Sequence, residues 1–222
     1  MLRAIVFDFD GVIVDSEPLH YRAYLEALRP LGVTFDYETY VREYIGFDDR
    51  EALRAIARRH QVPLTEERAA ALKAEKGLAF DRLARDHATP LPGAVELILA
   101  ASQRMLIAIA SGATRADIDA ILPAIGGGAI ADRFHAIVTA DDVERSKPDP
   151  HSYRLAVERL GVAAGESLAI EDTPAGIASA LGAGLKVLGL AGTHPPHKLA
   201  SAGRVVDTLR GVTVDRLVEW FG

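Results

Sequence analysis

The sequence predicts an α/β protein, in which a parallel sheet is covered by helices and an all-helical subdomain is inserted after the first strand. Residues 4–7 form a continuous apolar run of the kind found in strands that are buried on both faces. From residue 88 onward, similar runs alternate with amphipathic stretches, which is typical of a doubly wound, Rossmann-like sheet. We therefore expect residues 1–15 and 88–222 to form the core, and residues 16–87 to form a helical cap.

The elements of the predicted core follow one another in a regular order. After the strand at 4–7, further strands are expected at 105–110, 136–140, 167–172 and 185–190. Helical stretches lie between them, at 93–103, 114–122, 150–161 and 173–184. In a sheet of this class, binding sites form beyond the carboxyl ends of the strands, so we expect the functional residues there.

Residues 17–87 show a different pattern. Four stretches, at 18–32, 37–46, 48–61 and 65–87, carry helical periodicity and dense charge without a strand candidate. The chain then returns through "TPLPG", in which Pro90, Pro92 and Gly93 are typical of a hinge-like linker. The helical region is therefore expected to fold as a separate subdomain.

The composition argues against several classes of function. The 222 residues carry a formal net charge of -6, which does not favour binding to nucleic acid or to an anionic membrane surface. The chain has no cysteine, which excludes disulfides, thiolate metal sites and cysteine nucleophiles. No apolar run approaches the ~20 residues of a membrane helix, and no signal peptide is recognisable. We expect a soluble cytoplasmic protein with neither a nucleic-acid nor a membrane partner, as a monomer with an oligomer as the alternative.

Chemically complementary side chains stand where the predicted strands end. The set comprises Asp8 and Asp10 after the first strand, Ser111 and Gly112 after the second, Lys147 in the loop after the third, and Glu171 with Asp172 at the end of the fourth. Two neighbouring carboxylates in a half-buried position repel each other and require a compensating positive charge. The sequence therefore predicts a metal ion and a lysine at one edge of the sheet.

This set of side chains suits phosphoryl transfer. The oxygens of Asp8 and Asp172, completed by water, suit Mg²⁺, which prefers octahedral oxygen coordination. Ser111 and Lys147 offer a hydrogen bond and a positive charge to the oxygens of a phosphoryl group. Asp8 is the candidate nucleophile, and Asp10 is the candidate acid and base for the leaving oxygen and for water. The expected partner is a small phosphorylated metabolite.

Four ordered motifs resemble those of the haloacid dehalogenase superfamily. They are "DFDGV" at 8–12, a strand that ends in Ser111, "KPDP" at 147–150 and "IEDTPAGI" at 170–177. The helical insertion is similar to that of the small phosphatases and β-phosphoglucomutases in this superfamily. The resemblance implies a mobile cap that closes over the substrate and sets specificity.

The resemblance also implies a role for each motif residue. Asp8 would become an aspartyl phosphate, Asp10 would be the acid and base, and Ser111, Gly112 and Lys147 would hold the phosphoryl group. Mg²⁺ would be bound by Asp8, the Asp10 backbone carbonyl and Asp172, with Glu171 close behind. The dehalogenases that name the superfamily lack an acidic residue equivalent to Asp10, so its presence favours phosphoryl transfer.

Phosphatase and mutase activities are both compatible with these motifs. The chain resembles the β-phosphoglucomutases at His20 and Gly46, but Ile45 stands where they carry a lysine that grips the sugar phosphate. Arg50 is a candidate replacement for that charge. We therefore expect a phosphatase of small phosphomonoesters, of the sugar-phosphate or phosphoglycolate type, with a mutase as the alternative. His20, Gly46 and Arg50 are the candidate substrate-binding residues.

A non-enzymatic alternative is a phosphorylation-switched receiver domain, which groups similar residues around Mg²⁺. Such domains carry the acceptor aspartate on a central strand, not the first, and have no helical lid, so turnover is favoured here. A calcium loop is excluded, because the fifth, sixth and twelfth positions counted from Asp8 hold Val12, Ile13 and Leu19, where such a loop needs an oxygen ligand, a glycine and a glutamate. The stretch "THPPH" at 193–197 has no third histidine or other ligand nearby, and we expect it to be a solvated loop.

Overall fold

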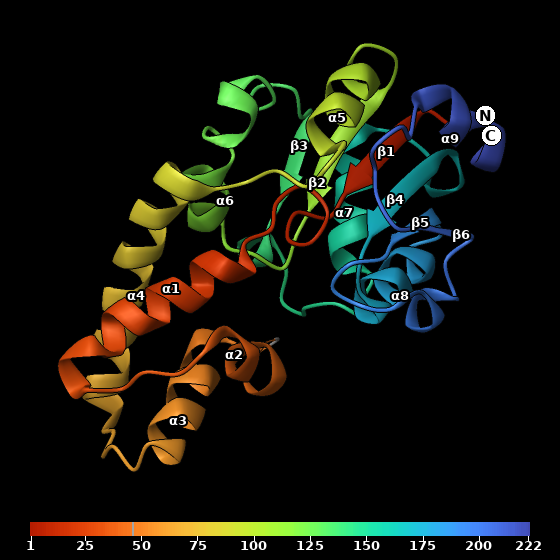
Figure 1. The fold of residues 1–222 in the computed structure, drawn as a ribbon. Helices are drawn as coiled ribbons and strands as arrows, with labels where there is room; N and C mark the ends of the chain where they lie inside the picture. Colours follow the sequence, from red (N-terminus) through yellow and green to blue (C-terminus); the bar gives the residue numbers. More distant parts are fainter. Residues whose placement is uncertain (46) are drawn as a thin grey trace. The chain divides into compact units, whose positions relative to one another are not determined.

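The computed structural model describes residues 1–45 and 47–222. The chain divides into two compact units, and each has its own set of elements. The core unit consists of Met1–Asp15 and Thr89–Gly222, and the helical unit consists of Ser16–Ala88. Figure 1 shows the strands in the core unit and only helices in the helical unit.

The core unit is built on a six-stranded parallel sheet in the order β3-β2-β1-β4-β5-β6. The strands are β1 (Ala4–Phe7), β2 (Leu106–Ala110), β3 (Ala136–Val138), β4 (Ser167–Glu171), β5 (Lys186–Leu190) and β6 (Arg204–Val206). β1 lies in the middle, with Phe7 opposite Ile109 of β2 and Ile170 of β4. The predicted doubly wound α/β sheet is confirmed.

Two details of the sheet differ from the sequence-based expectation. β6 was not predicted, because three partly exposed residues at the edge of a sheet give neither an alternating pattern nor an apolar run. β3 ends at Val138 and not at residue 140, because the Thr139 side chain caps a short 3₁₀ helix that follows directly.

Helices cover both faces of the sheet. Ala4, Val6 and Ala108 point to the face on which α7 (His151–Leu160) and α8 (Pro174–Gly182) pack, and Tyr153 of α7 is buried in the same hydrophobic cluster. Figure 1 shows α5 and α8 on opposite sides of the strands. The α-helices of the core are α5 (Ala94–Ser102), α6 (Arg115–Ile121), α7 (His151–Leu160), α8 (Pro174–Gly182) and α9 (Val214–Phe221), and the 3₁₀ helices are η2 (Ile125–Gly128), η3 (Ala140–Asp142), η4 (Ala164–Glu166) and η5 (Pro196–Leu199).

The helical unit contains α1 (Glu17–Leu28), η1 (Arg29–Leu31), α2 (Tyr37–Glu43), α3 (Asp49–Arg59) and α4 (Glu66–His87). Side-chain oxygens of Asp36, Asp48 and Thr65 accept hydrogen bonds from backbone N–H groups in the first turns of α2, α3 and α4, which explains where these helices begin. α1 packs along α4. The unit has a hydrophobic core of its own, which includes Tyr24, Leu28, Tyr40, Leu53, Ile56 and Leu72.

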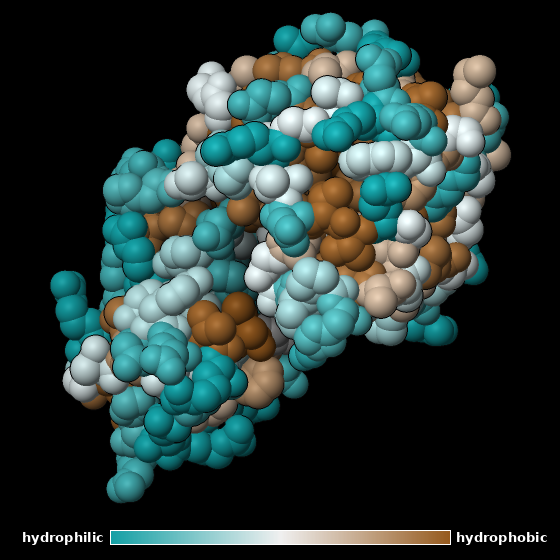
Figure 2. Space-filling view, turned by 45° about the vertical axis from the view of Figure 1, so that its right-hand side comes forward, coloured by the Kyte–Doolittle hydropathy of each residue, from teal (hydrophilic) through white to brown (hydrophobic). Residues whose placement is uncertain are grey.

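On the face in Figure 2, hydrophobic side chains form separate patches among hydrophilic ones. Large exposed hydrophobic residues are dispersed along the chain, as at Val41, Leu78 and Leu181. Over the described residues, the helices are all too short or too polar to span a bilayer.

Gly93 joins the returning linker to α5 through a close backbone contact. Its φ is +90°, and a β-carbon at this position would lie 2.3 Å from the Arg210 nitrogen and from the Leu209 carbonyl carbon. We expect Gly93→Ala to lower the free energy of unfolding by about 1–3 kcal/mol through backbone strain, with the collision adding to this loss. Urea denaturation followed by circular dichroism would measure the change.

Gly165→Ala is the matched control, because the β-carbon that it adds has no described atom within 4 Å apart from those of its own local segment. This variant is expected to stay within about 0.5 kcal/mol of the parent protein. Equal unfolding free energies for the two variants would contradict the assignment of Gly93 to a backbone contact that excludes side chains.

Candidate active site

The strand order brings the acidic residues together. β1 and β4 are neighbours, and the Asp8 backbone N–H donates to the Ile170 carbonyl at 3.0 Å. Asp8 therefore leaves the sheet beside Glu171 and Asp172. This is the point where the strand order reverses, and in open parallel sheets ligands bind in the crevice at such a point.

A tight turn follows Asp8 and carries Asp10. The Phe9 carbonyl accepts hydrogen bonds from the backbone N–H groups of Ile13 at 2.9 Å and Val14 at 3.2 Å. Gly11 has a φ of +73°, and a β-carbon there would lie 2.0 Å from Asp172 Oδ2. Glycine is required at this position because the backbone of the turn approaches a carboxylate at the end of β4.

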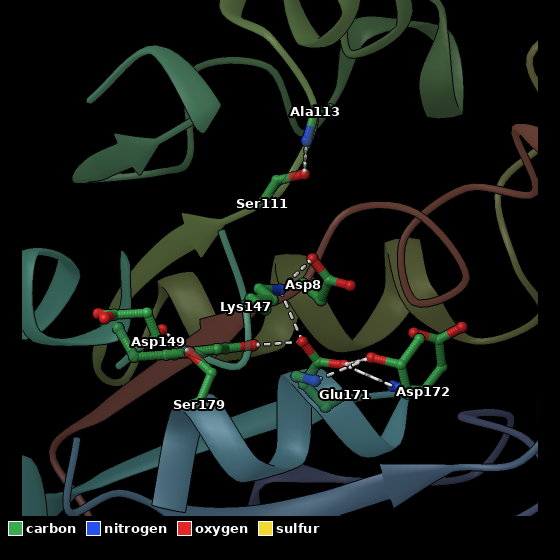
Figure 3. Close-up of polar contacts among 11 residues, drawn as sticks. Asp8, Ser111, Ala113, Lys147, Asp149, Glu171, Asp172 and Ser179 are labelled. Carbon is green, nitrogen blue, oxygen red and sulfur yellow. Dashed lines mark hydrogen bonds and ion pairs between the residues drawn. The ribbon is translucent and has the colours of Figure 1, made fainter. Parts of the chain in front are cut away.

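Lys147 lies between two carboxylates. Its Nζ donates to Asp8 Oδ1 at 2.8 Å and to Glu171 Oε1 at 2.6 Å, as Figure 3 shows. The side chains of Lys147, Asp8 and Glu171 are only 12%, 10% and 0% exposed. Burial opposes the charge on Lys147, but Asp8 and Glu171 outweigh it and raise the pKa of the ammonium group. Lys147 is therefore a fixed positive charge at this edge of the sheet.

Glu171 is held by donors on both of its oxygens. Oε1 accepts from Lys147 and from the Tyr153 hydroxyl at 2.9 Å, and the Tyr153 ring centroid lies 5.0 Å from Lys147 Nζ. Oε2 accepts from the Asp172 N–H at 3.0 Å and from the Thr173 N–H and hydroxyl at 3.2 and 3.1 Å. These bonds saturate the acceptor positions of a carboxylate, so Glu171 anchors Lys147 and the end of β4.

The acidic cluster fits a divalent cation. Oxygens of Asp8, Glu171 and Asp172 lie within 4.8 Å of one another. Burial and the charge of Glu171 raise the pKa of Asp8, against the opposing effect of Lys147. Burial also raises the pKa of Asp172 to about 7, although the nearby Thr193 hydroxyl opposes the shift. Asp172 Oδ1 is buried without a hydrogen-bond partner among the described residues, and oxygens of this kind are ligands for Mg²⁺.

The predicted phosphate-binding residues line one pocket. A cavity of about 250 Å³ in the core unit is bordered by Ser111, Gly112 and Lys147. Ser111 Oγ accepts a hydrogen bond from the Ala113 N–H at 2.9 Å (Figure 3). This bond uses an acceptor position of the hydroxyl and not its hydrogen, so Ser111 keeps a donor for a ligand oxygen.

The predicted substrate-binding residues belong to the helical unit. His20 lies in α1 and Arg50 in α3, whereas Gly46 lies outside the described residues. The Arg50 side chain is 59% exposed, and its guanidinium group pairs with Glu66, which also pairs with Arg54. The assignment of these residues to substrate binding stays a prediction.

A buried polar network lies inside the helical unit and was not predicted from the sequence. Lys76 is 3% exposed, and its Nζ contacts Asp49 Oδ1 at 2.7 Å and His20 Nδ1 at 2.8 Å. The Tyr24 hydroxyl donates to the same Asp49 oxygen at 2.7 Å, and the His20 ring stacks on Phe80. The network joins α1, α3 and α4, so no local sequence pattern could reveal it. Helical periodicity alone does not distinguish Lys76, or Tyr153 of the core unit, from the other residues of its helix.

The Lys76 contact fixes His20 in its neutral form. An ammonium group only donates, so His20 Nδ1 must be the acceptor. Burial and the charge of Lys76 lower the pKa of His20 to about 3, although Asp49 opposes the shift. In the unfolded chain histidine titrates at a pKa of about 6.5. Between these values the unfolded chain binds a proton that the folded chain does not, so acid destabilises the fold.

We expect the free energy of unfolding to lose up to about 1.4 kcal/mol for each pH unit below about 6.5 because of His20. Urea denaturation at pH 7.0, 6.0 and 5.0 would measure the slope. His20→Asn is the comparison, because its amide oxygen can accept the Lys76 hydrogen bond but does not titrate. The variant should show a flatter pH dependence; identical slopes would contradict the neutral assignment of His20.

The chain belongs to the haloacid dehalogenase-like hydrolases, whose family model matches residues 2–184. Protein CbbY of Rhodobacter capsulatus is 33% identical over 198 residues, which cover 84% of each chain. Validoxylamine A 7'-phosphate phosphatase of Streptomyces hygroscopicus subsp. limoneus is 30% identical over 213 residues, or 96% of each chain. The resemblance based on the four motifs and the prediction of a hydrolase of this superfamily are confirmed.

Solved structures support the same relationship. CbbY from Rhodobacter sphaeroides in complex with phosphate superposes with a TM-score of 0.85 and 28% identity, covering 98% of this chain and 100% of that chain. A mutant of that protein in complex with xylulose-1,5-bisphosphate gives a TM-score of 0.81 at 28% identity, covering 94% and 95% of the two chains.

Membership of this hydrolase family argues against a receiver domain. However, the reason based on the strand that carries Asp8 was wrong. β1 is first in the sequence and is also central in the sheet, so the strand position of Asp8 does not separate the two classes. The separation depends on the family match and on the helical unit, whose helices occupy Glu17–His87.

Proposed function

We propose that the protein is a Mg²⁺-dependent phosphatase that hydrolyses small phosphorylated carbohydrates through an aspartyl phosphate on Asp8. The observation that carries the proposal is the buried ion triad, in which Lys147 bonds to both Asp8 and Glu171. A nucleophilic carboxylate next to a fixed cation suits attack on a phosphorus atom whose oxygens are negatively charged. The relative named as a 7'-phosphate phosphatase and the neighbour in complex with xylulose-1,5-bisphosphate favour a carbohydrate phosphate as substrate.

The residues of the core unit account for both steps of hydrolysis. Lys147 bonds to Oδ1 of Asp8, so Oδ2 is the oxygen that attacks phosphorus. The new Asp8–phosphorus bond forms as the ester bond breaks, and Asp10 donates a proton to the leaving oxygen. Asp10 then takes a proton from a water molecule, whose oxygen attacks phosphorus and displaces Asp8. The products are the free alcohol and inorganic phosphate.

Three groups would hold the transferring phosphoryl group. Lys147 has three N–H bonds, of which two are directed to Asp8 and Glu171, so the third is assigned to a phosphoryl oxygen. Ser111 contributes its hydroxyl hydrogen, and Gly112 its backbone at the wall of the same pocket. These donors act where negative charge is concentrated, as transition-state stabilisation requires.

The metal ion would be held by Asp8, the Asp10 backbone carbonyl and Asp172. When bound, Mg²⁺ supplies positive charge to the phosphoryl oxygens and to the carboxylates. Glu171 is placed behind these ligands and not among them. Its oxygens already accept hydrogen bonds from Lys147, Tyr153 and the start of the loop after β4. Its role is to orient Lys147.

We assign the choice of substrate to the helical unit, with His20, Gly46 and Arg50 as the candidate contacts. Hydrolysis is favoured over mutase activity because Ile45 is uncharged where a mutase carries a lysine for its sugar phosphate. The expected substrate is a sugar phosphate, and a compound of the phosphoglycolate type is the alternative.

Release of inorganic phosphate from a panel of small phosphomonoesters, with and without Mg²⁺, tests the proposal. We expect release that depends on Mg²⁺ and that falls by about a thousandfold or more in Asp8→Asn, because that variant lacks the nucleophile. The panel includes β-glucose 1-phosphate, with chromatographic detection of glucose 6-phosphate. Isomerisation with little phosphate release would establish the mutase instead, and equal rates for the parent and the variant would refute the role of Asp8.

A further inference from the structure

The loop after β5 brings a hydroxyl group to the metal-binding carboxylate that follows β4. β5 pairs with β4, so the loop that begins at Ala191 leaves the sheet beside Asp172. The Thr193 hydroxyl lies close enough to the Asp172 carboxylate to oppose the rise in its pKa. The point where a β-carbon of Gly11 would stand lies 2.0 Å from Asp172 Oδ2 and 2.9 Å from Thr193 Oγ1. Three segments that are distant in sequence therefore meet around one carboxylate.

The two oxygens of Asp172 have different surroundings. Oδ2 faces the Gly11 turn, where the Thr193 hydroxyl also lies. Oδ1 is buried, and the described part of the chain provides it with no hydrogen-bond partner. Leaving a buried carboxylate oxygen unpaired is unfavourable, so this orientation needs a group that holds the other oxygen.

We propose that Thr193 is a positioning residue that fixes Asp172 through Oδ2 and thereby presents Oδ1 to the divalent cation. The proposal rests on the metal site described under the proposed function. In this proposal the functional residue of the loop at 193–197 is its threonine, and its two histidines have no role. A hydrogen bond to the outer oxygen of a ligating carboxylate fixes its orientation, and loss of such a partner weakens metal binding by about 10–100-fold.

The chain offers closely matched variants for the test. Thr193→Val replaces the hydroxyl by a methyl group with almost no change of shape, and Thr193→Ser keeps the hydroxyl but removes the methyl group. A purely structural role in packing the loop predicts that the serine variant is affected at least as strongly as the valine variant. A positioning role through the hydroxyl predicts the reverse order.

The experiment is calorimetric titration of the full chain with Mg²⁺ alone, without substrate. We expect the Mg²⁺ dissociation constant to rise about 10-fold or more in Thr193→Val and by less than about threefold in Thr193→Ser. Thermal unfolding without metal should differ little between the two variants, whereas the stabilisation produced by added Mg²⁺ should be smaller for valine. If Thr193→Val does not fold, Thr193→Ala replaces it, with the same expectation.

Failure of this inference can be distinguished from failure of the proposed function. An unchanged Mg²⁺ dissociation constant in the valine variant, with tight binding by the parent protein, would overturn the role of Thr193 and leave the metal site in place. Equal weakening in the valine and serine variants would also overturn it, in favour of loop packing. No Mg²⁺ binding by the parent protein would overturn the metal site itself, and the inference with it.

Discussion

The ion triad of Asp8, Lys147 and Glu171 is the constraint on which the rest of the core depends. Three carboxylates meet at one edge of the sheet, and Lys147 supplies a buried positive charge among them. Burying a charge is costly unless it is paired and hydrogen-bonded, and breaking such a pair costs about 3–5 kcal/mol. The fold therefore has to bring a lysine from the loop after β3 to the ends of β1 and β4, which the order of the strands achieves.

The hydrogen-bond donors around Glu171 and Asp172 show how the negative charge of these carboxylates is stabilised. Glu171 pairs with Lys147 and accepts further hydrogen bonds from Tyr153 and from the backbone after β4, so all its acceptor positions are used within the protein. Asp172 differs, because one of its oxygens is buried without a partner in the described part of the chain. The set of hydrogen bonds is complete for Glu171, which orients Lys147. It is incomplete for Asp172, which faces the proposed metal. The polar network of the core therefore fits the divalent cation of the proposed function.

The sequence predicted those parts of the molecule that depend on local patterns. Apolar runs located five of the six strands, and the polar residues at the ends of these runs were enough to predict that Asp8, Lys147 and Asp172 lie together. The roles of these residues in catalysis stay predictions. What could not be predicted depends on contacts between distant segments. Tyr153 occupies a helix position that periodicity assigns to the core, and only the approach of α7 to the end of β4 shows that its hydroxyl reaches Glu171. β6 was missed because its short run at the edge of the sheet carries too little pattern.

Contacts between distant segments also could not be predicted in the helical unit, and they change which positive charge there is important. Similarity to a family motif favoured Arg50 as the replacement for a missing lysine, but this side chain is 59% exposed and pairs with Glu66. Among the described residues of this unit, the buried cation is Lys76, which lies on another helix and is neutralised by Asp49 at 2.7 Å. An exposed, screened arginine contributes little fixed field, whereas a buried ammonium held by a carboxylate, a neutral histidine and two aromatic rings has a defined position. Burial and pairing therefore determine which cation of the helical unit is fixed in place, and proximity in sequence to a family motif does not.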